Sequence, residues 1–441
     1  MRVLIMGAAG RDYHDFLTVF EDREDAEVVA FTRAPGQNLG ELGGVDRRFP
    51  SALAGEGYPE GIPIEPEERL AELVETHDVD QVVFSYSDVS HEHVMHAASR
   101  AMAAGADFRI VGPDAMMLEA SVPVLAVDAV RTGCGKSQAA GAFADALADR
   151  GHAVRLIREP MPYGDLVENR VQRFASHADL DAAGVTIEER EEYEQHVDAG
   201  HVVFAGVDYE AVLDAAEAEA DVIVWDGGNN ELPFVRPDLH VVLADPLRAG
   251  DETSYHPGET NLRRADCVLL NKENTADAVA PVVENVREVN PDADIRHADS
   301  VVSVPDPDRI DGARVLAVED GPTLTHGDAT RGAAAVAAET YGAAARVDPT
   351  DAAVGSIAEA LAEYDHLDGV LPAMGYSDEQ IRDLEATIAG VDCDLVLAGT
   401  PHDLARQVDV DVPVVDVGYD IDLHEGSFDD LLDRYDDRLG L

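Results

Sequence analysis

The sequence predicts an α/β fold in which an N-terminal Rossmann-like domain is followed by a P-loop NTPase domain and a C-terminal α/β extension. Short apolar runs of four to six residues recur along the chain and alternate with amphipathic segments of helical periodicity. This alternation is typical of parallel sheets covered by helices. One apolar run, 124–130, leads into TGCGKS at 132–137. A strand, a glycine-containing loop and Lys-Ser in this order are typical of a triphosphate-binding site.

The 441 residues are too many for one ordinary domain. We place the Rossmann-like domain at 1–120, the P-loop nucleotide-binding domain at 121–310 and the C-terminal α/β portion at 311–441. In the first domain the pattern predicts strands at 3–6, 27–31, 81–84 and 107–111, and helices at 12–20, 66–76 and 92–104.

The second and third segments continue in the same α/β style. In the P-loop domain the expected helix is 138–150, a polar stretch at 176–200 indicates a helical excursion, and the expected strands are 124–130, 153–157, 201–205, 222–225, 239–243 and 267–271. In the C-terminal portion we expect strands at 314–318, 395–398 and 414–417 and helices at 333–341, 355–362 and 378–389. This portion either completes the middle sheet or stands alone, and the sequence leaves both arrangements open.

Charge restricts the classes of partner and of compartment. The chain carries 89 acidic and 32 basic residues, a net charge of −57. Such a chain repels nucleic acid and anionic membranes, so we expect neither as a partner. Hydrophobic content is an ordinary 46%, and no apolar run reaches the length of a membrane span. The pattern favours a carboxylate-covered cytoplasmic protein of a halophile, and three widely spaced cysteines argue against a disulfide framework.

The strongest motif is the loop after the run 124–130. Gly133 and Gly135 allow the backbone to wrap closely around phosphate oxygens, and Lys136 is placed to reach the β- and γ-phosphates. The common pattern has glycine where this chain has Val130. Arg131 is our candidate for an additional catalytic cation. The nucleotide-binding residues expected in this segment are Thr132, Gly133, Cys134, Gly135, Lys136, Ser137 and Gln138.

A second motif supplies the carboxylate that a magnesium-nucleotide site needs. The run 222–225 ends in Asp226 followed by two glycines, where P-loop proteins place the residue that orients Mg²⁺. We therefore expect Ser137 and Asp226 to hold the metal, and Lys136 and Asp226 to be catalytic. A strand-ending turn is the simpler alternative for Asp226.

A third motif, NKEN at 271–274, resembles the base-reading element of GTPases. We expect Asn271 and Lys272 to contact the nucleotide. The chain has only two lysines, Lys136 and Lys272, and both lie in nucleotide-binding signatures. Asn274 stands where guanine readers have aspartate, which weakens guanine selectivity because an amide oxygen carries no charge. ATP and GTP both remain open.

The remaining loops are candidates for substrate contacts. We expect these residues to come from the loops that follow predicted strands: Arg158, Tyr163, Asp165, Asn229 and His326. For the arginine, a surface ion pair is the alternative. The loop GAAGRD at 7–12 is a weak Rossmann signal, for which a substrate, a phosphate or no ligand at all is favoured over NAD.

Taken together, the motifs resemble the cyclic 2,3-diphosphoglycerate synthetase family of archaea and its GTPase relatives. The segments that carry the resemblance are MGAAGRDYHDF, SYSDVSHEHVMH, AVRTGCGKSQ, PMPYGDL, WDGGNNELPF, EDGPTLTHG and LPAMGYS. The resemblance implies ATP, Mg²⁺ and 2,3-bisphosphoglycerate as ligands, an intramolecular phosphoanhydride as product, and ADP and phosphate as by-products. A GTPase and a non-catalytic nucleotide-sensing scaffold are the alternatives. We also expect a homo-oligomer, a dimer in the first instance.

The charge pattern predicts that folding depends on salt. The Debye length is about 10 Å at 0.1 M salt and about 3 Å at 1 M, so neighbouring carboxylates stop repelling one another only at high salt. We expect the melting temperature to rise steeply as KCl increases toward 1 M, measured by circular dichroism. Sucrose at matched osmolality serves as the uncharged control. A melting temperature independent of KCl would contradict a halophilic surface.

Overall fold

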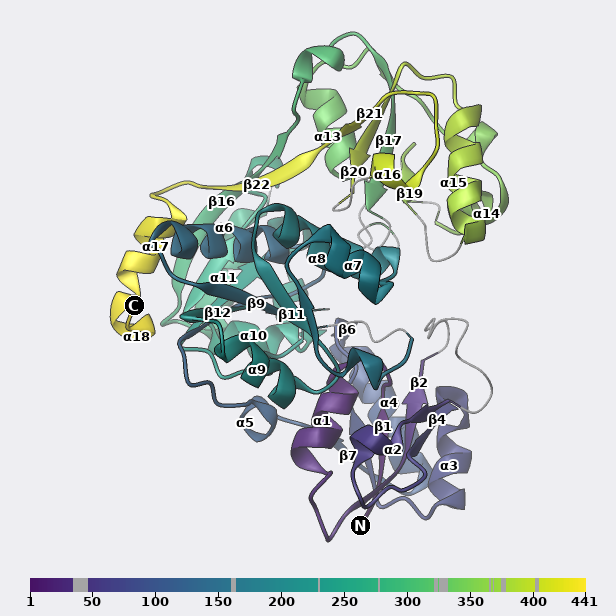
Figure 1. Ribbon diagram of the computed structural model, residues 1–441, viewed down its shortest axis with the longest axis vertical. Helices are drawn as coiled ribbons and strands as arrows, with labels where there is room; N and C mark the ends of the chain where they lie inside the picture. The colour runs from purple at the N-terminus through teal and green to yellow at the C-terminus, as the bar shows by residue number, and fades with distance from the viewer. Residues whose placement is uncertain are drawn as a thin grey trace.

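The computed structural model shows three α/β units arranged along the long axis of the molecule, with the N-terminal domain at the bottom of Figure 1 and the C-terminal unit at the top. No helix in the described part of the chain is long and apolar enough to cross a membrane. The structure describes residues 1–34, 47–159, 164–228, 231–276, 278–320, 324, 332–364, 366–367, 369–373, 378–400 and 404–441. Three predicted substrate-loop residues lie outside these ranges: Tyr163, Asn229 and His326.

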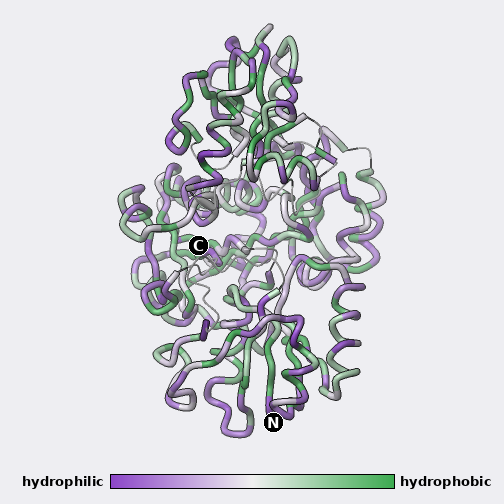
Figure 2. Tube along the Cα trace, turned by 90° about the vertical axis from the view of Figure 1, so that its right-hand side faces the viewer, coloured by the Kyte–Doolittle hydropathy of each residue, from purple (hydrophilic) through white to green (hydrophobic). Residues whose placement is uncertain are grey.

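The N-terminal domain is a six-stranded sheet in the order β3-β4-β2-β1-β5-β7. Apolar residues fill the central strands, which Figure 2 shows as hydrophobic segments in the middle of this domain. All strand pairs are parallel except β3 with β4. The strands are β1 (Arg2–Met6), β2 (Glu27–Arg33), β3 (Arg48–Phe49), β4 (Ile62–Pro66), β5 (Gln81–Phe84) and β7 (Asp107–Ile110). The helices are α1 (Arg11–Val19), α2 (Ser51–Ala54), α3 (Leu70–Thr76), α4 (His91–Ala104) and α5 (Pro113–Met116).

The middle domain is a nine-stranded sheet in the order β10-β11-β9-β12-β8-β13-β15-β16-β22. Its strands are β8 (Val124–Ala129), β9 (Val154–Arg158), β10 (Gln172–Phe174), β11 (Val202–Ala205), β12 (Val222–Asp226), β13 (Leu239–Ala244), β15 (Cys267–Leu270), β16 (Asp294–Ser303) and β22 (Gly418–Leu423). Its helices are α6 (Lys136–Asp149), α7 (His177–Ala183), α8 (Ile187–Asp198), α9 (Tyr209–Glu217), α10 (Gly258–Arg264) and α11 (Val279–Val289). The strand that precedes the P-loop, β8, lies between β12 and β13.

The C-terminal segment forms its own parallel sheet, in which β19 also pairs with β17. The chain then returns to the middle domain through β22, which pairs antiparallel with β16, and through α17 (Phe428–Arg434) and α18 (Asp436–Leu439). Both arrangements left open by the sequence are therefore present, because the sheet is separate while the last residues join the middle domain. The separate unit contains β17 (Arg314–Asp320), β18 (Ala345–Arg346), β19 (Leu371–Ala373), β20 (Leu395–Gly399), β21 (Val414–Asp416), α13 (Ala333–Thr340), α14 (Gly355–Glu363), α15 (Asp378–Gly390) and α16 (Leu404–Gln407).

The N-terminal and middle domains share one hydrophobic core. A single cluster of buried residues joins Phe16 of α1 to Trp225 of β12. At its centre Phe234 stacks on the His14 ring of the N-terminal domain at 4.2 Å and lies 5.1 Å from Trp225. Because apolar side chains of both domains pack in this cluster, α1 is fixed against the middle sheet.

We predict that Phe234→Ala destabilises both domains together. Phe234 is fully buried, and removal of a buried phenylalanine ring costs about 3–5 kcal/mol of unfolding free energy. Trp225 is the single tryptophan of the chain, so its fluorescence reports on this contact directly. We expect a lower melting temperature and a red-shifted emission.

The matched control is Phe174→Ala. Phe174 is also buried but stacks on Tyr193, away from Trp225. This control should lower the melting temperature and leave the emission unchanged. If Phe234→Ala melts at the wild-type temperature, the two domains do not depend on a shared core.

Candidate functional site

The predicted P-loop connects the end of β8 to the beginning of α6. Gly133 and Gly135 have φ angles of +83° and +100°, in the left-handed region that favours glycine. Gly135 has a second reason to be glycine, since a Cβ there would lie 2.5 Å from the Asn271 amide nitrogen. Val130 instead donates its backbone N–H to the Leu243 carbonyl at 2.9 Å and has no positive φ. Valine is therefore tolerated at the position where the common motif has glycine.

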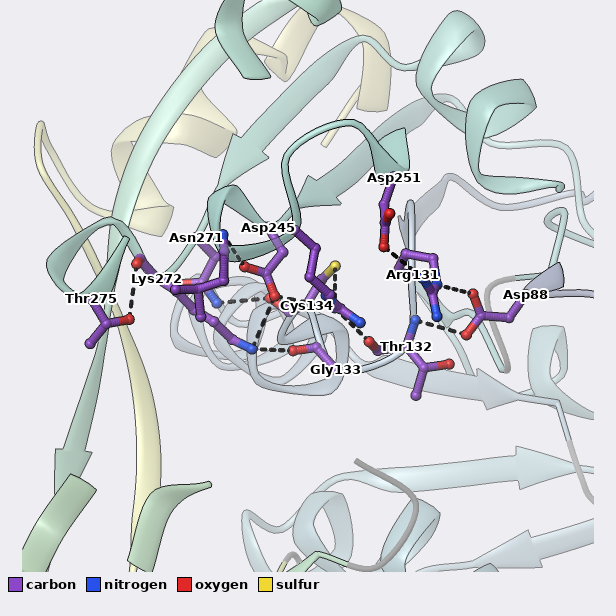
Figure 3. Close-up of polar contacts among 12 residues, drawn as sticks. Asp88, Arg131, Thr132, Gly133, Cys134, Asp245, Asp251, Asn271, Lys272 and Thr275 are labelled. Atoms are coloured by element: carbon purple, nitrogen blue, oxygen red, sulfur yellow. Dashed lines mark hydrogen bonds and ion pairs between the residues drawn. The ribbon is translucent and has the colours of Figure 1, made fainter. Parts of the chain in front are cut away.

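Side chains from two neighbouring strand ends hold the P-loop by its carbonyl groups (Figure 3). Lys272 Nζ donates to the Gly133 carbonyl at 2.5 Å, and Asn271 Nδ2 donates to the Cys134 carbonyl at 2.9 Å. Arg248 Nη2 donates to the Thr132 carbonyl at 2.7 Å. Asn271 and Lys272 thus bind the backbone of the P-loop, and their predicted contact with the nucleotide stays a prediction.

Asn274, the fourth residue of the NKEN motif, is bound to the adjacent strand. Its Nδ2 donates to the Ser300 carbonyl at 2.7 Å, and its Oδ1 accepts the Ser300 N–H at 3.2 Å. Both ends of the amide therefore attach the loop to β16. Asn274 thus makes a structural contact, and this contact does not decide whether the protein prefers ATP or GTP.

Lys136 lies buried at the beginning of α6, close to the predicted metal carboxylate. Burial lowers the pKa of Lys136, and the Arg158 guanidinium lowers it further, whereas the carboxylates of Asp226 and Asp128 oppose both effects. Asp128 is itself fully buried and accepts from the Trp225 indole at 3.3 Å. The lysine thus stands among two carboxylates and one guanidinium inside the protein.

Arg158 connects the two predicted metal ligands. Its Nη1 lies 2.7 Å from Asp226 Oδ1 and 3.3 Å from the Ser137 hydroxyl. The same side chain pairs with Glu192 of α8. His196, also on α8, places its Nε2 2.9 Å from Asp226 Oδ2. Burial alone would raise the pKa of Asp226, but Arg158, His196 and Lys136 lower it to about 2, so this carboxylate is ionised.

The same geometry tests whether a divalent cation fits. Ser137 and Asp226 provide a hydroxyl and a carboxylate, the oxygen ligands that Mg²⁺ prefers. A positively charged nitrogen of Arg158 already lies within 3.3 Å of both oxygens. The donor set fits magnesium, and Mg²⁺ bound between these two residues would take the position that the Arg158 nitrogen holds.

Arg131, predicted as a catalytic cation, bridges the N-terminal and middle domains. Its Nε donates to Asp88 at 2.7 Å and its Nη1 pairs with Asp251 at 2.6 Å (Figure 3). The Arg131 guanidinium also stacks 3.6 Å from the Tyr255 ring. Asp88 also accepts the Thr132 N–H at 3.1 Å. Nearby, β6 (Val89–Ser90) pairs with β14 (Tyr255–His256). The contacts place Arg131 as a support of the P-loop, and its catalytic role stays a prediction.

The backbone N–H groups of the GAAGRD loop bind a carboxylate from the loop itself. The Asp12 carboxylate accepts the N–H groups of Ala9 at 2.9 Å, Gly10 at 3.3 Å and Tyr13 at 2.8 Å. A Cβ on Gly7 would lie 2.5 Å from Asp12 Oδ2, so glycine is required there. The sequence left a substrate, a phosphate or no ligand open for this loop and disfavoured NAD. The Asp12 carboxylate takes the backbone N–H groups that a phosphate would use, which argues against a phosphate here.

Glu159, the residue after Arg158, lies between the GAAGRD loop and the Asp-Gly-Gly turn. A Cβ on Gly10 or on Gly228 would lie 2.3 Å from a Glu159 carboxylate oxygen. Sequence reasoning did not single out Glu159, Asp128 or His196. Glu159 directly precedes the segment PMPYGDL, Asp128 lies in the run 124–130 before the P-loop, and His196 belongs to no motif.

Asp165, the other described candidate for a substrate contact, binds the backbone of the turn that it begins. Asp165 is exposed, and its carboxylate accepts the backbone N–H groups of Val167 at 2.8 Å and Glu168 at 3.3 Å. Among the predicted substrate-contact residues that the structure describes, Arg158 is therefore the one that lies at the P-loop.

Comparison with known proteins gives one close relative. A scan against models of protein families finds no match. The arginine synthetase ArcE of Thermococcus kodakarensis is 54% identical over 423 residues, which cover 96% of this chain and 93% of that protein. Among solved structures, LpxK of Aquifex aeolicus in complex with ATP aligns with a TM-score of 0.41 and 15% identity over 73% of this chain and 90% of its own. A ParA family ATPase of Chlorobium tepidum aligns with a TM-score of 0.27 and 16% identity over 40% of this chain and 82% of its own.

The alignment with ArcE extends over nearly the whole of both chains. The chain therefore belongs to the family of the arginine synthetase ArcE of Thermococcus kodakarensis.

Proposed function

We propose that the protein is an ATP-dependent ligase that forms the guanidinium group of arginine. The observation that carries a ligase is the convergence of Lys136, Ser137 and Asp226 at the carboxyl ends of two adjacent strands, around the Arg158 guanidinium. The choice of arginine comes from the printed name of the relative with 54% identity.

The chemistry needs a phosphate leaving group. Citrulline carries a ureido group where arginine carries a guanidinium. Transfer of the γ-phosphoryl group to the ureido oxygen releases ADP and converts that oxygen into a good leaving group. Attack by ammonia on the same carbon then expels phosphate, and the loss of one proton leaves the guanidinium. The whole step consumes ATP, citrulline and ammonia and yields ADP, phosphate and arginine.

Each residue of the P-loop edge has a part in this reaction. Lys136 supplies a positive charge where charge develops on the transferred group, and the N–H groups of the loop and of the α6 N-terminus bind phosphate oxygens. Ser137 and Asp226 would hold Mg²⁺, which when bound neutralises phosphate charge and aligns the transferred group. His196 and Arg158 keep Asp226 ionised and oriented.

A second candidate is the formation of cyclic 2,3-diphosphoglycerate, which the motif resemblance implies. It uses the same logic, because one substrate phosphate would be activated and the other would displace it. The cations Lys136 and Arg158 favour a polyanionic acceptor, and Arg11 lies in the adjacent domain contact. The carboxyl groups of Asp226 and Glu159, which lie at the same strand ends, disfavour a polyanionic acceptor.

Product analysis separates the candidates. Purified protein in molar KCl is incubated with Mg²⁺ and ATP or GTP, together with citrulline and ammonium, with 2,3-bisphosphoglycerate, or with no acceptor. Phosphorus NMR and amino-acid analysis identify the products. We expect arginine and phosphate with citrulline and ammonium. A cyclic phosphoanhydride would support the second candidate, phosphate without acceptor a GTPase or ATPase, and no turnover a sensing scaffold.

We predict that Lys136→Arg lowers turnover at least ~10²-fold, about 2.7 kcal/mol in barrier. The lysine provides a compact charge that the planar guanidinium replaces poorly, and the site already contains Arg158. Asp226→Asn should be similarly slow and should require more Mg²⁺. Turnover is measured at saturating nucleotide, and circular dichroism confirms the fold.

Lys272→Arg is the comparison, because Lys272 binds the loop carbonyl of Gly133 from outside. We expect it to change turnover less than about tenfold, on the order of 1.4 kcal/mol. Wild-type turnover by Lys136→Arg would show that the loop binds nucleotide without catalysing transfer.

A further inference from the structure

A group of buried charges lies where the N-terminal domain meets the middle domain. Arg11 and Asp15 belong to α1, Glu159 follows β9, and Glu231 lies after the Asp-Gly-Gly turn. Their exposed fractions are 1%, 0%, 7% and 5% in that order. Asn261 of α10, fully buried, donates to the Glu231 carbonyl at 2.8 Å and so belongs to the same group.

The charges in this group are only loosely paired. Arg11 Nη1 lies 3.7 Å from Glu231 Oε2, and Arg11 Nε lies 3.8 Å from Asp15 Oδ2. Both separations exceed a hydrogen bond. Asp15 has a closer partner in the Ser85 hydroxyl, which donates at 2.7 Å. One guanidinium therefore faces three carboxylates, counting Glu159, and forms a short hydrogen bond with none of them.

Four acceptor atoms in the group have no hydrogen-bond donor among the residues that the structure describes: Asp15 Oδ1, Glu159 Oε2, Glu231 Oε2 and Asn261 Oδ1. Two donor atoms of Arg11, Nε and Nη1, likewise have no acceptor at hydrogen-bond distance. Buried polar atoms are nearly always satisfied, because an unmet acceptor in the protein interior is costly. Burial raises the pKa of Glu159 and of Glu231, the latter to about 8, although the charge of Arg11 lowers both. A partner for the acceptor atoms of Glu159, Glu231 and Asn261 must bring N–H groups.

The group of buried charges lies beside the candidate site of Lys136, Ser137 and Asp226. Glu159 adjoins Arg158 in sequence, and its carboxylate is packed against Gly228, two residues beyond Asp226. A ligand held by Glu159 would therefore be near the position where the γ-phosphate is expected. Gly10 and Gly228 permit this because a side chain at either position would collide with the Glu159 carboxylate.

We propose that Glu159 and Glu231, with the Asn261 carbonyl, form the binding site for the nitrogen-bearing end of the acceptor, a ureido or guanidinium group. The inference rests on the proposed function and gives it a substrate-recognition site. A planar group with several N–H donors matches paired carboxylate oxygens. Arg11 shows that a guanidinium fits against Glu231, although at 3.7 Å it leaves the oxygen without a hydrogen bond. A polyanion such as 2,3-bisphosphoglycerate offers no N–H donor to these acceptor atoms.

Calorimetry on the whole protein in molar KCl tests the site. The probes are methylguanidine, arginine and 2,3-bisphosphoglycerate, each with and without ADP. The variants are Glu159→Gln and Glu231→Gln, which keep shape and remove charge. The control is Glu67→Gln, since Glu67 is equally buried at 6% exposure but pairs with Arg100 at 2.9 Å outside the group.

We expect the wild type and the control to bind methylguanidine and arginine, and both site variants to bind them at least tenfold more weakly with ADP affinity unchanged. The melting temperatures of the site variants without ligand should not fall, because an unmet carboxylate is removed. Methylguanidine should raise the melting temperature of the wild type and not of the variants, which keeps the test valid if calorimetric heats are small.

The outcomes separate the site from the reaction. If methylguanidine binding is lost in the variants but the wild type makes no arginine from citrulline, the binding site stands and the proposed function fails. If the wild type makes arginine and the variants bind methylguanidine as tightly as the wild type, the function stands and the site is wrong. Tight binding of 2,3-bisphosphoglycerate that needs Glu159 would also overturn the site.

Discussion

The buried ion pair between Arg158 and Asp226 constrains the strand ends and the helix that surround the P-loop. Asp226 is fully buried at the end of β12, and an isolated carboxylate in that position would be too costly to keep ionised. Its oxygens lie 2.7 Å from Arg158 and 2.9 Å from His196. This requirement fixes the end of β9, which carries Arg158, and the position of α8, which carries His196. Lys136 completes the neutralisation from the P-loop side.

The sheet strands and the P-loop could be predicted because their signals are local. The run 222–225 was expected as a strand and lies within β12, Val222–Asp226, and the expected helix 138–150 corresponds to α6, Lys136–Asp149. Other features depend on distant partners. β22 was not predicted, since its residues alternate between exposed and half-buried and it pairs with β16, more than a hundred residues earlier. His196 lies on a polar helix whose sequence indicates a solvated surface, and its contact with Asp226 is a tertiary feature.

The P-loop was recognised from its sequence, but its supports were not. Arg131 was predicted as a catalytic cation because it lies within the loop, and the structure adds that two carboxylates from different parts of the chain bind it. Asp88, from the N-terminal domain, accepts the Thr132 N–H. The N-terminal domain is thus part of the nucleotide site through this bond and through the shared core around Phe234. Spacing along a sequence cannot reveal a contact that depends on how two domains dock.

The chain as a whole is strongly acidic, whereas Lys136 and Arg158 are buried cations beside the P-loop. A chain with a net charge of −57 repels a triphosphate at long range, and salt on the order of 1 M reduces that repulsion to a range of about 3 Å. Buried charges are screened much less. In the proposed function, Lys136 and Arg158 would therefore attract phosphate at any salt concentration, and the oxygens of Glu159 and Glu231 would accept N–H groups under the same conditions. Because Arg158 and Glu159 are consecutive residues, the proposed sites for an anion and for a cationic or ureido acceptor would adjoin each other. High salt then makes the anion's approach possible without weakening the interior contacts that select it.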